Sequence, residues 1–348
     1  MHVNIAFCAF AHEHMDVRVS QPIHALRSAG ANVRYFEKKL GTIRNCAPGE
    51  AKIAIIQRGL PEAKGWPATV KRFLENDWLL IHECDDFPKT ELSVKNGYWQ
   101  RSLGWKTFEM CHAVQTSTPP LANEFLKRND EVGMFPNQLF KLPQERPSGE
   151  GPLKIFFGAL NRREAWQPII ADINKVLNQH PKLHVVVVQD RDFFDALTCS
   201  KKVFYPVQCY ADYMKLLSDC DIALLPLNAS KFNSFKSDIK FVEAAGARTA
   251  VVASPTVYQH TIRHGQTGLV ARSPQEWSKH LVKLIESAAY RSQVMKAAFN
   301  YVESERMLDS HIQHRLNWYR SLWLRRKELN QKLFEKFPAI NPHHTDGT

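Results

Sequence analysis

Short runs of apolar, often β-branched residues alternate with amphipathic helical stretches along almost the whole chain. In the first half this pattern predicts helices at 18–29, 67–76, 99–110 and 118–128, between strands at 2–9, 31–36, 51–57, 78–84 and 112–117. The second half repeats it, with expected strands near 153–158, 183–189, 202–206, 221–227, 249–254 and 268–271. Such alternation is typical of parallel sheets covered by helices on both faces. The predicted fold class is therefore α/β, with doubly wound, Rossmann-like sheets.

A segment rich in proline, glycine and charge, at 142–154, is the best candidate for a domain boundary. The chain of 348 residues is long enough for two domains, which we place at 1–145 and 151–302. The remaining pattern is helical only and forms a long basic segment at 303–337. Residues 338–348 are predicted to be a frayed tail.

Composition narrows the function classes. A chain with 44% hydrophobic and 23% charged residues is typical of globular proteins. No apolar run approaches the ~20 residues of a membrane helix, and the seven cysteines form no CxxC pair, which favours reduced thiols in a cytoplasmic protein. The net charge of +11 is compatible with nucleic acid, an anionic membrane surface or a polyphosphate-bearing substrate. The motifs GxGxxG, GxxxxGKS/T, GxSxG and HExxH are absent, which weakens dehydrogenase, P-loop kinase, hydrolase and zincin hypotheses.

The most informative segment is 219–254, in which a buried strand runs into a polar loop and then a helix. The pattern predicts that this helix begins near Asn233 or Ser234. Lys236, Lys240 and Glu243 would then share one helix face. A helix start that also presents lysines is suited to bind an anion. The residues alone are equally compatible with a solvated face on which Lys240 and Glu243 form a weak surface ion pair.

From 221–227 (DIALLPL) through 240–254 (KFVEAAGARTAVVAS) to 265–270 (GQTGLV), the chain resembles the donor half of GT-B glycosyltransferases. The resemblance is greatest to the large retaining group called family four, with its KxxEAxAxGxPVVAS helix. It implies that Glu243 hydrogen-bonds the nucleotide-sugar donor, usually at the ribose, and that the turn from Gly265 to Gly268 belongs to the same site.

One departure from the family concerns Phe235, which stands where the family often has a second glutamate. How the donor sugar is held, and whether its configuration is retained, therefore stays open. Lys236, Ser237 and Lys240 match the KSxxKxxE form of this helix that occurs among surface-polysaccharide transferases.

Two further loops follow predicted strands. Gly158, Asn161, Arg162 and Arg163 come after the first strand of the second domain, where the family supplies a basic residue to the donor diphosphate. Guanidinium groups bind phosphate oxygens bidentately, so Arg162 or Arg163 fits this role, although the residues also fit an exposed helix-start loop.

In the first domain, Asp85 and Asp86 follow a buried strand, in a segment similar to the YEIDDD of some polysaccharide transferases. Such carboxylates could orient acceptor hydroxyls, act as a general base or hold a divalent ion. An acidic loop that caps the next element is nearly as good an interpretation. His82 beside them is better explained as a histidine at the edge of the core.

The opening loop at 11–18 follows the first strand, and the resemblance suggests that it contacts acceptor or donor through Arg18, as in the YRxxxP start of similar enzymes. His12 and His14 in this loop lack a third metal ligand in the sequence. GT-B enzymes have a C-terminal helix that crosses back onto the first domain. The apolar stripe of Trp318, Leu322, Leu329 and Leu333 favours that packing over a membrane-surface helix.

The sequence thus predicts transfer of a sugar from a nucleotide-sugar donor to a glycan or lipid-linked acceptor. Lys236, Lys240, Arg162 or Arg163 would stabilise the departing diphosphate, which makes a metal unnecessary. Peripheral contact with an anionic membrane fits the charge, and no nucleic-acid partner is expected. Two alternatives are a GT-B-like sugar-nucleotide epimerase, which needs no acceptor, and a basic polyanion-binding module without catalysis.

Overall fold

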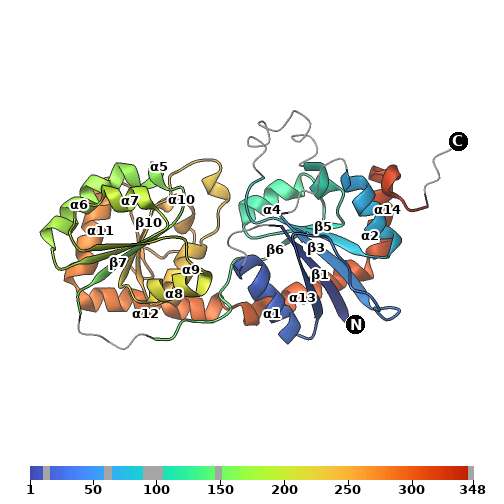
Figure 1. Cartoon of the computed structure of the whole chain (residues 1–348), viewed down its shortest axis with the longest axis horizontal. Coiled ribbons are helices and arrows are strands. Elements are labelled where there is room, and N and C mark those ends of the chain that lie inside the picture. The colour runs from blue at the N-terminus through green and yellow to red at the C-terminus, as the bar shows by residue number, and fades with distance from the viewer. Residues whose placement is uncertain (11–15, 59–64, 89–104, 146–150, 344–348) are drawn as a thin grey trace. The chain divides into compact units, whose positions relative to one another are not determined.

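The computed structural model describes residues 1–10, 16–58, 65–88, 105–145 and 151–343. It divides the chain into two compact units (Figure 1). The first unit joins Met1–Phe140 to Leu308–Thr348, and the second unit is Lys141–Met307. Each unit contains one six-stranded sheet. The C-terminal part of the chain therefore belongs to the unit in which the chain begins.

The sheet of the first unit is parallel and has the strand order β2-β1-β3-β4-β5-β6. Its strands are β1 (Val3–Ala9), β2 (Asn32–Glu37), β3 (Ala51–Gln57), β4 (Leu79–Glu83), β5 (Ala113–Thr116) and β6 (Val132–Met134). Strands β1, β3 and β4 are buried along nearly their whole length, because helices cover both faces of the sheet. This explains why their sequences are apolar runs without a polar alternate face.

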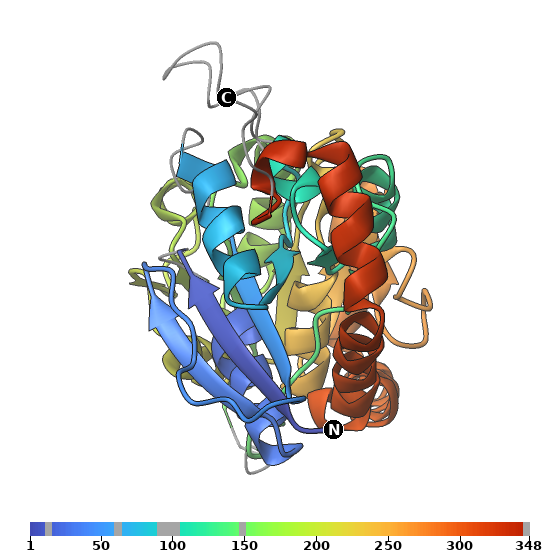
Figure 2. The same ribbon diagram turned by 90° about the vertical axis from the view of Figure 1, so that its right-hand side faces the viewer.

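Alternate side chains of these strands enter two separate cores. Phe7 and Ile55 pack with α1 (Gln21–Ser28) and α13 (Leu308–Leu324) on one face of the sheet. On the other face the strands pack with α2 (Trp66–Glu75) and with Leu333 of α14 (Arg326–Lys336). Figure 2 shows the last helices, in red, running beside this unit's strands. The unit is completed by the π-helix η1 (Asp16–Ser20), by α4 (Pro119–Leu126) and by the 3-10 helix η6 (Pro338–Ile340).

The sheet of the second unit is also parallel, with the order β12-β11-β10-β7-β8-β9. Its strands are β7 (Lys154–Gly158), β8 (His184–Val188), β9 (Lys202–Tyr205), β10 (Ile222–Leu225), β11 (Ala250–Ala253) and β12 (Leu269–Val270). The chain builds one half of this sheet from β7 outward to β9, and the other half from β10 to β12. The order therefore reverses between β7 and β10, which are neighbours.

Helices cover both faces of the second sheet (Figure 1). One face packs against α6 (Ile170–Gln179) and α11 (Pro274–Glu286). The other lies against α9 (Ile239–Gly246) and α12 (Ala288–Glu305). The shorter helices are α5 (Arg163–Trp166), η4 (Gln167–Ile169), α7 (Arg191–Ala196), α8 (Tyr210–Ser218), η5 (Asn233–Phe235) and α10 (Pro255–Tyr258).

The predicted α/β fold class with two Rossmann-like units is confirmed, and every predicted strand is present to within two residues at either end. Strand β6 is absent from the predictions, because three residues centred on a glycine give no apolar run. The predicted helix at 99–110 is observed at 105–109, and its residues 99–104 lie outside the described part of the chain. No helix in the described residues is long and apolar enough to cross a membrane.

Two helix predictions are wrong in detail. The expected single helix at 303–337 contains instead the end of α12, which stops at Glu305, and the two helices α13 and α14, which meet at Arg325. The helix expected to begin at Asn233 or Ser234 begins instead at Ile239. The side chain of Asn233 donates to the backbone oxygen of Asn228 at 3.1 Å, and so closes the preceding loop instead of capping a helix.

Candidate functional site

The reversal of strand order between β7 and β10 marks where a ligand is expected in a sheet of this kind, at the carboxyl ends of the strands. Two loops follow these strands, at 159–162 and 226–238. Asn228 of the second loop donates through Nδ2 to Glu164 Oε2 at 3.1 Å, and Glu164 lies in helix α5, which begins directly after the first loop. The basic residues that the sequence singled out in both loops therefore lie at the same end of the second sheet.

The loop after β7 brings Arg162 to this edge. Asn161 has a positive φ of 55°, a conformation that asparagine tolerates better than most residues. Gly158 is required by packing, since a Cβ there would lie 2.5 Å from the Phe156 ring and 2.8 Å from that of Tyr213. The loop is therefore held close against Tyr213 at the end of the strand.

The structure separates the two arginines of this loop. Arg163 forms a surface ion pair with Asp192 at 3.4 Å, and about two thirds of each side chain is exposed. Arg162 is half-buried, and its side chain makes no hydrogen bond or ion pair with any described residue. Of the two, Arg162 is the better placed to bind a ligand anion.

The shared helix face predicted for Lys236 and Lys240 is wrong. Lys236 lies before the helix in an extended conformation, with φ −68° and ψ 154°. Its ammonium group lies 4.7 Å from the centroid of the Phe232 ring. Ser237 follows it in the same segment, and Phe235, directly before it, is buried.

A buried ion pair fixes the start of helix α9. Asp238 precedes the helix and accepts hydrogen bonds from Arg306 Nη1 at 2.7 Å and Nη2 at 2.8 Å. Thr261 donates a third bond to the same carboxylate at 2.7 Å. Burial alone would raise the pKa of Asp238, but the bonds from Arg306 outweigh it and lower this pKa. The bidentate pair explains why the helix begins at Ile239.

On α9, Lys240 and Glu243 form the ion pair that their spacing predicts, with 3.3 Å between Nζ and Oε2. The pair is not on the surface, because the Glu243 side chain is only 4% exposed. Lys240 also donates to the hydroxyl of Tyr213 at 2.9 Å. Glu243 Oε2 is buried and accepts no hydrogen bond within the described residues. This oxygen can accept a bond from a ligand hydroxyl.

Tyr258, at the end of α10, lies where the charged groups of both loops and of α9 affect its pKa. Burial raises its pKa to about 12, the positive charges of Arg162 and Lys240 oppose the rise, and the carboxylates of Asp238 and Glu243 add to it. Burial, with Glu243, likewise raises the pKa of Tyr213. Arg162 and Lys240 therefore act on one small region, although they come from different loops.

The predicted turn from Gly265 to Gly268 is present as a tight backbone turn. The Gly265 N–H donates to the Gly268 oxygen at 2.8 Å, and Gly265 has a φ of 79°, in the region that favours glycine. The Tyr290 hydroxyl donates to the Gly265 oxygen at 3.2 Å. The turn leads into the short edge strand β12.

In the first unit, the two acids that follow β4 are paired with an arginine that the sequence analysis missed. Arg58 Nε lies 2.7 Å from Asp85 Oδ1, and its Nη2 lies 3.2 Å from Asp86 Oδ2. Burial would raise the pKa of Asp85, but Arg58 outweighs it and the pKa is lowered. The available signal was the position of Arg58 directly after β3, the strand next to β4.

Beneath these acids lies a second pair, Arg18 and Glu83, whose side chains are 3% and 0% exposed. Arg18 Nε donates to Glu83 Oε1 at 2.7 Å, and Arg18 Nη1 donates to the Phe135 oxygen at 2.7 Å. Buried Arg315, from α13, also acts on the Glu83 charge. Because Arg18 is buried and paired, the structure argues against the substrate contact expected of it. His12 and His14 of the same loop lie outside the described residues.

The described residues contain no group of three or more His, Cys, Asp or Glu side chains placed to hold a metal ion. At the strand ends of the first unit the described charged groups form ion pairs, whereas those of the second unit include a basic cluster of Arg162, Lys236 and Lys240. That cluster is suited to an anion.

Residues 151–287 match the family model described as "Glycosyl transferases group 1". No curated protein is significantly similar to the chain in sequence. HepE of Anabaena, solved in complex with UDP and glucose, matches with a TM-score of 0.65 at 14% identity, over 92% of this chain and 100% of that one.

Two further solved structures have similar folds. Sucrose-phosphate synthase of Thermosynechococcus elongatus matches with a TM-score of 0.59 and 13% identity, over 96% of this chain and all of that one. The pneumococcal O-GlcNAc transferase GtfA, in complex with UDP and GlcNAc, has a TM-score of 0.59 and 11% identity, over 80% of this chain and 58% of that one. These similarities establish the two-unit fold, and the family model matches residues of the second unit alone.

Proposed function

We propose that this protein transfers a sugar from a nucleoside diphosphate sugar to a hydroxyl of a glycan or lipid-linked acceptor. The observation that carries the proposal is Arg162, a half-buried arginine with no ion-pair or hydrogen-bond partner in the described chain. It lies at the strand-order reversal of the unit that matches the family model. A diphosphate is the anion that such a position in a donor-binding unit would take.

In the proposed reaction the bond between the anomeric carbon and the diphosphate oxygen breaks, and the acceptor hydroxyl oxygen bonds to that carbon. The acceptor proton leaves to a base or to the departing phosphate. Arg162 and Lys236 neutralise the charge that grows on the leaving group. Glu243 accepts a hydrogen bond from a donor hydroxyl through its buried oxygen, and Lys240 holds that carboxylate in place by their ion pair.

The finer assignment that we propose is a family-four-like enzyme that acts without a bound metal, with a surface polysaccharide or related glycoconjugate as its product. The KSxxK segment at 236–240 and the Glu243 helix support it. The UDP complexes of HepE and GtfA favour a uridine nucleotide in the first trials.

A nucleotide panel tests the proposal. UDP, GDP, ADP, dTDP and CMP are added at rising concentration, and thermal unfolding is followed. At 100 times its dissociation constant, the cognate nucleotide should add about 2.7 kcal/mol to the unfolding free energy. Glu243→Gln should keep the fold and cost roughly 1.5–3 kcal/mol in donor binding. If none of the five nucleotides shifts the transition, the donor site is refuted.

Activity assays separate the alternatives. Incubation of the matching sugar nucleotide with and without candidate acceptors should give transfer only in their presence. Conversion of the sugar nucleotide without an acceptor would identify an epimerase instead. Activity should survive EDTA, and loss of activity with recovery on Mg²⁺ or Mn²⁺ would refute the metal-free mechanism.

A further inference from the structure

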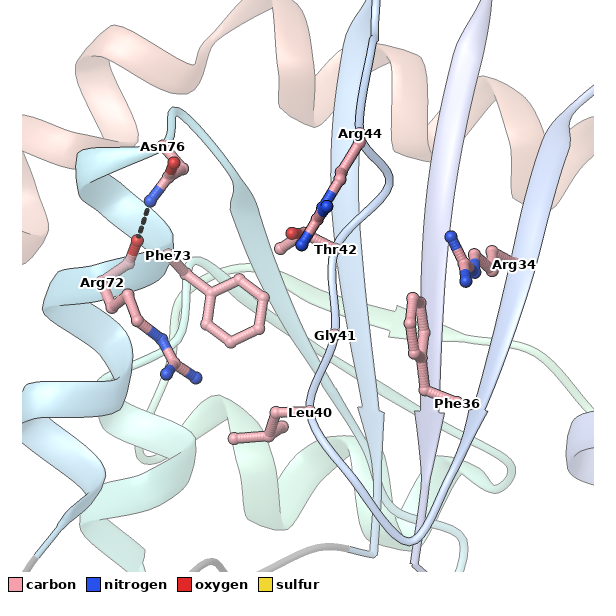
Figure 3. A pocket seen from close by; sticks show the side chains of 9 residues that line it. All are labelled: Arg34, Phe36, Leu40, Gly41, Thr42, Arg44, Arg72, Phe73 and Asn76. Atoms are coloured by element: carbon pink, nitrogen blue, oxygen red, sulfur yellow. Dashed lines mark hydrogen bonds between the residues drawn. The ribbon is translucent and has the colours of Figure 1, made fainter.

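The first unit contains a cavity that the proposed transfer reaction does not use. Its volume is about 480 Å³, within the range of small-molecule sites. It lies between β2, the loop at 40–44 and helix α2, on the face of the sheet that α2 covers (Figure 3). Neither the acids after β4 nor their partner Arg58 are among its lining residues. The cavity is therefore separate from the strand-end charges of the same unit.

Three arginines from three different elements line this cavity. Arg34 comes from β2, Arg44 from the loop and Arg72 from α2, and their guanidinium groups turn toward the space between strand and helix (Figure 3). All three are exposed, and none forms an ion pair or a side-chain hydrogen bond with any described residue. The lining residues in the described chain include no carboxylate.

This lack of pairing differs from the pairing of two other arginines in the same unit. Arg18 and Arg58 of this unit each contact a carboxylate oxygen at 2.7 Å. Three positive charges that converge on one cavity repel each other, and the attraction of an anion bound between them offsets this repulsion. The arrangement therefore fits a ligand with at least two negative charges.

The rest of the cavity wall is apolar. Phe36 and Phe73 face the cavity from β2 and α2, and they are 8% and 2% exposed. Leu40 adds to the same wall. The loop approaches the Phe36 ring so closely that a Cβ at Gly41 would lie 2.2 Å from a ring carbon. Only glycine, which has no Cβ, lets the backbone lie this close to the ring. The shape of the cavity therefore depends on Gly41.

We propose that this cavity binds a phosphate monoester or diphosphate attached to an apolar or aromatic group. The arginines supply bidentate donors for the phosphate oxygens, and the phenylalanine wall contacts the attached group. Two sources carry this chemistry: a soluble phosphorylated compound and the headgroup of an anionic lipid. The inference does not depend on the sugar-transfer reaction.

Phenyl phosphate is the probe for the soluble source. Its binding to the full chain is measured by calorimetry, against inorganic phosphate, which lacks the ring, and phenol, which lacks the charge. Hydrogen exchange locates the site, and we expect protection of peptides that cover 34–44 and 66–76. Arg34→Gln and Arg72→Gln should each weaken binding about tenfold or more. Lys39→Gln, an equal loss of charge beside the cavity but outside its lining, should leave it unchanged.

Vesicles test the lipid source. Phosphatidylcholine vesicles with and without phosphatidic acid are sedimented with the protein, and the same three variants are compared. Vesicle binding that needs Arg34 and Arg72, with weak phenyl phosphate binding, identifies a lipid headgroup, and the reverse identifies a soluble ligand. The proposal is overturned if neither probe binds, if Lys39→Gln weakens binding as much as the arginine variants, or if protection appears only in the second unit.

Discussion

In both units a strand-end loop places an arginine beside the point where the strand order reverses, but Arg58 and Arg162 have different surroundings. Arg58, after β3, contacts two carboxylates that follow the neighbouring strand. Arg162, after β7, has no carboxylate partner among the described residues. At the strand ends of the first unit, the charge of Arg58 is neutralised by its carboxylate partners. At the strand ends of the second unit, Arg162 keeps a positive charge that a ligand can neutralise.

This difference shows that sheet topology alone does not make a site. Parallel sheets with a reversal bring loops together at the same edge in both units. The chemistry at these strand ends depends on whether the charges of the side chains placed there neutralise each other. In the first unit Asp85 has a lowered pKa, which makes it a weaker proton acceptor near neutral pH. In the second unit, the buried Glu243 oxygen and Arg162 have bonding capacity left.

The largest expected effect is on the buried pair of the first unit. Arg18→Met leaves the Glu83 carboxylate buried without its hydrogen-bond donor. We expect the unfolding free energy of this unit to fall by about 3–5 kcal/mol, measured by urea denaturation with hydrogen exchange of β4 as the local readout.

Arg325→Met is the matched control. Arg325 pairs with Glu131 at 2.6 Å, but 41% of its side chain is exposed, so we expect a cost of about 1 kcal/mol or less. Equal costs in the two variants would show that burial of the Arg18 pair does not make it more important. The double variant Arg18→Met, Glu83→Leu should recover part of the loss, since it removes the uncompensated charge.

The second largest effect concerns Arg162, in the loop after β7. Arg162→Gln should reduce turnover by about a hundredfold to a thousandfold, because it removes a donor to the departing diphosphate. Arg163→Gln should change turnover by little, within about 0.5 kcal/mol, since its side chain is exposed. Steady-state kinetics with the cognate sugar nucleotide measures both. Equal effects would remove the distinction between the two arginines.

Much of the fold could be predicted from the sequence, because buried parallel strands are continuous apolar runs and their helices have a clear amphipathic period. The exceptions have physical causes. Helix α9 starts at Ile239 because Asp238 is held by Arg306, 68 residues later in the chain. A contact between residues so far apart in the chain leaves no signal in the local sequence pattern. The break at Arg325 between α13 and α14 also gives no proline or glycine signal.

The candidate site was predictable in its residue types and less so in its pairings. Arg162, Lys240 and Glu243 were expected at one site and lie at the same edge, since each follows or packs beside a strand end. The prediction for Lys236 failed because it assumed a helix that begins six residues too early. Arg58 was missed because an isolated arginine after a strand has no motif of its own.

The third largest expected effect is a loss of stability of the first unit in acid, caused by His112. His112 is buried, accepts a hydrogen bond from the Leu80 N–H at 2.8 Å and lies 2.7 Å from Asn330 of α14. Burial lowers its pKa from 6.5 to about 4. The native state therefore binds fewer protons than the unfolded state between these values, so stability is present above pH 6.5 and is lost as pH falls toward 4.

The loss attributable to His112 should reach about 3 kcal/mol. Urea denaturation from pH 7 to pH 4, with hydrogen exchange to assign the transition to a unit, should show that the first unit loses stability first. His112→Asn should have a lower stability at pH 7 and a flatter pH dependence. A wild-type slope that persists in His112→Asn would assign the acid sensitivity to other groups.

The smallest expected effect concerns Asp85, the acid that the sequence offered as a catalytic residue. Its pair with Arg58 is partly exposed, at 32% for the arginine and 16% for the aspartate, so a double-mutant cycle of Arg58→Gln and Asp85→Asn should give a coupling of about 0.5–1 kcal/mol. If the pair only orders the loop, the two single variants should lower turnover by similar factors, each below about tenfold. If Asp85 is a general base, Asp85→Asn alone should cost about a hundredfold or more at unchanged stability. Because Arg58 holds the pKa of Asp85 low, we expect the first result. The Arg58–Asp85 pair then orders the loops at these strand ends, whereas the charge of Arg162 in the second unit is available to a ligand.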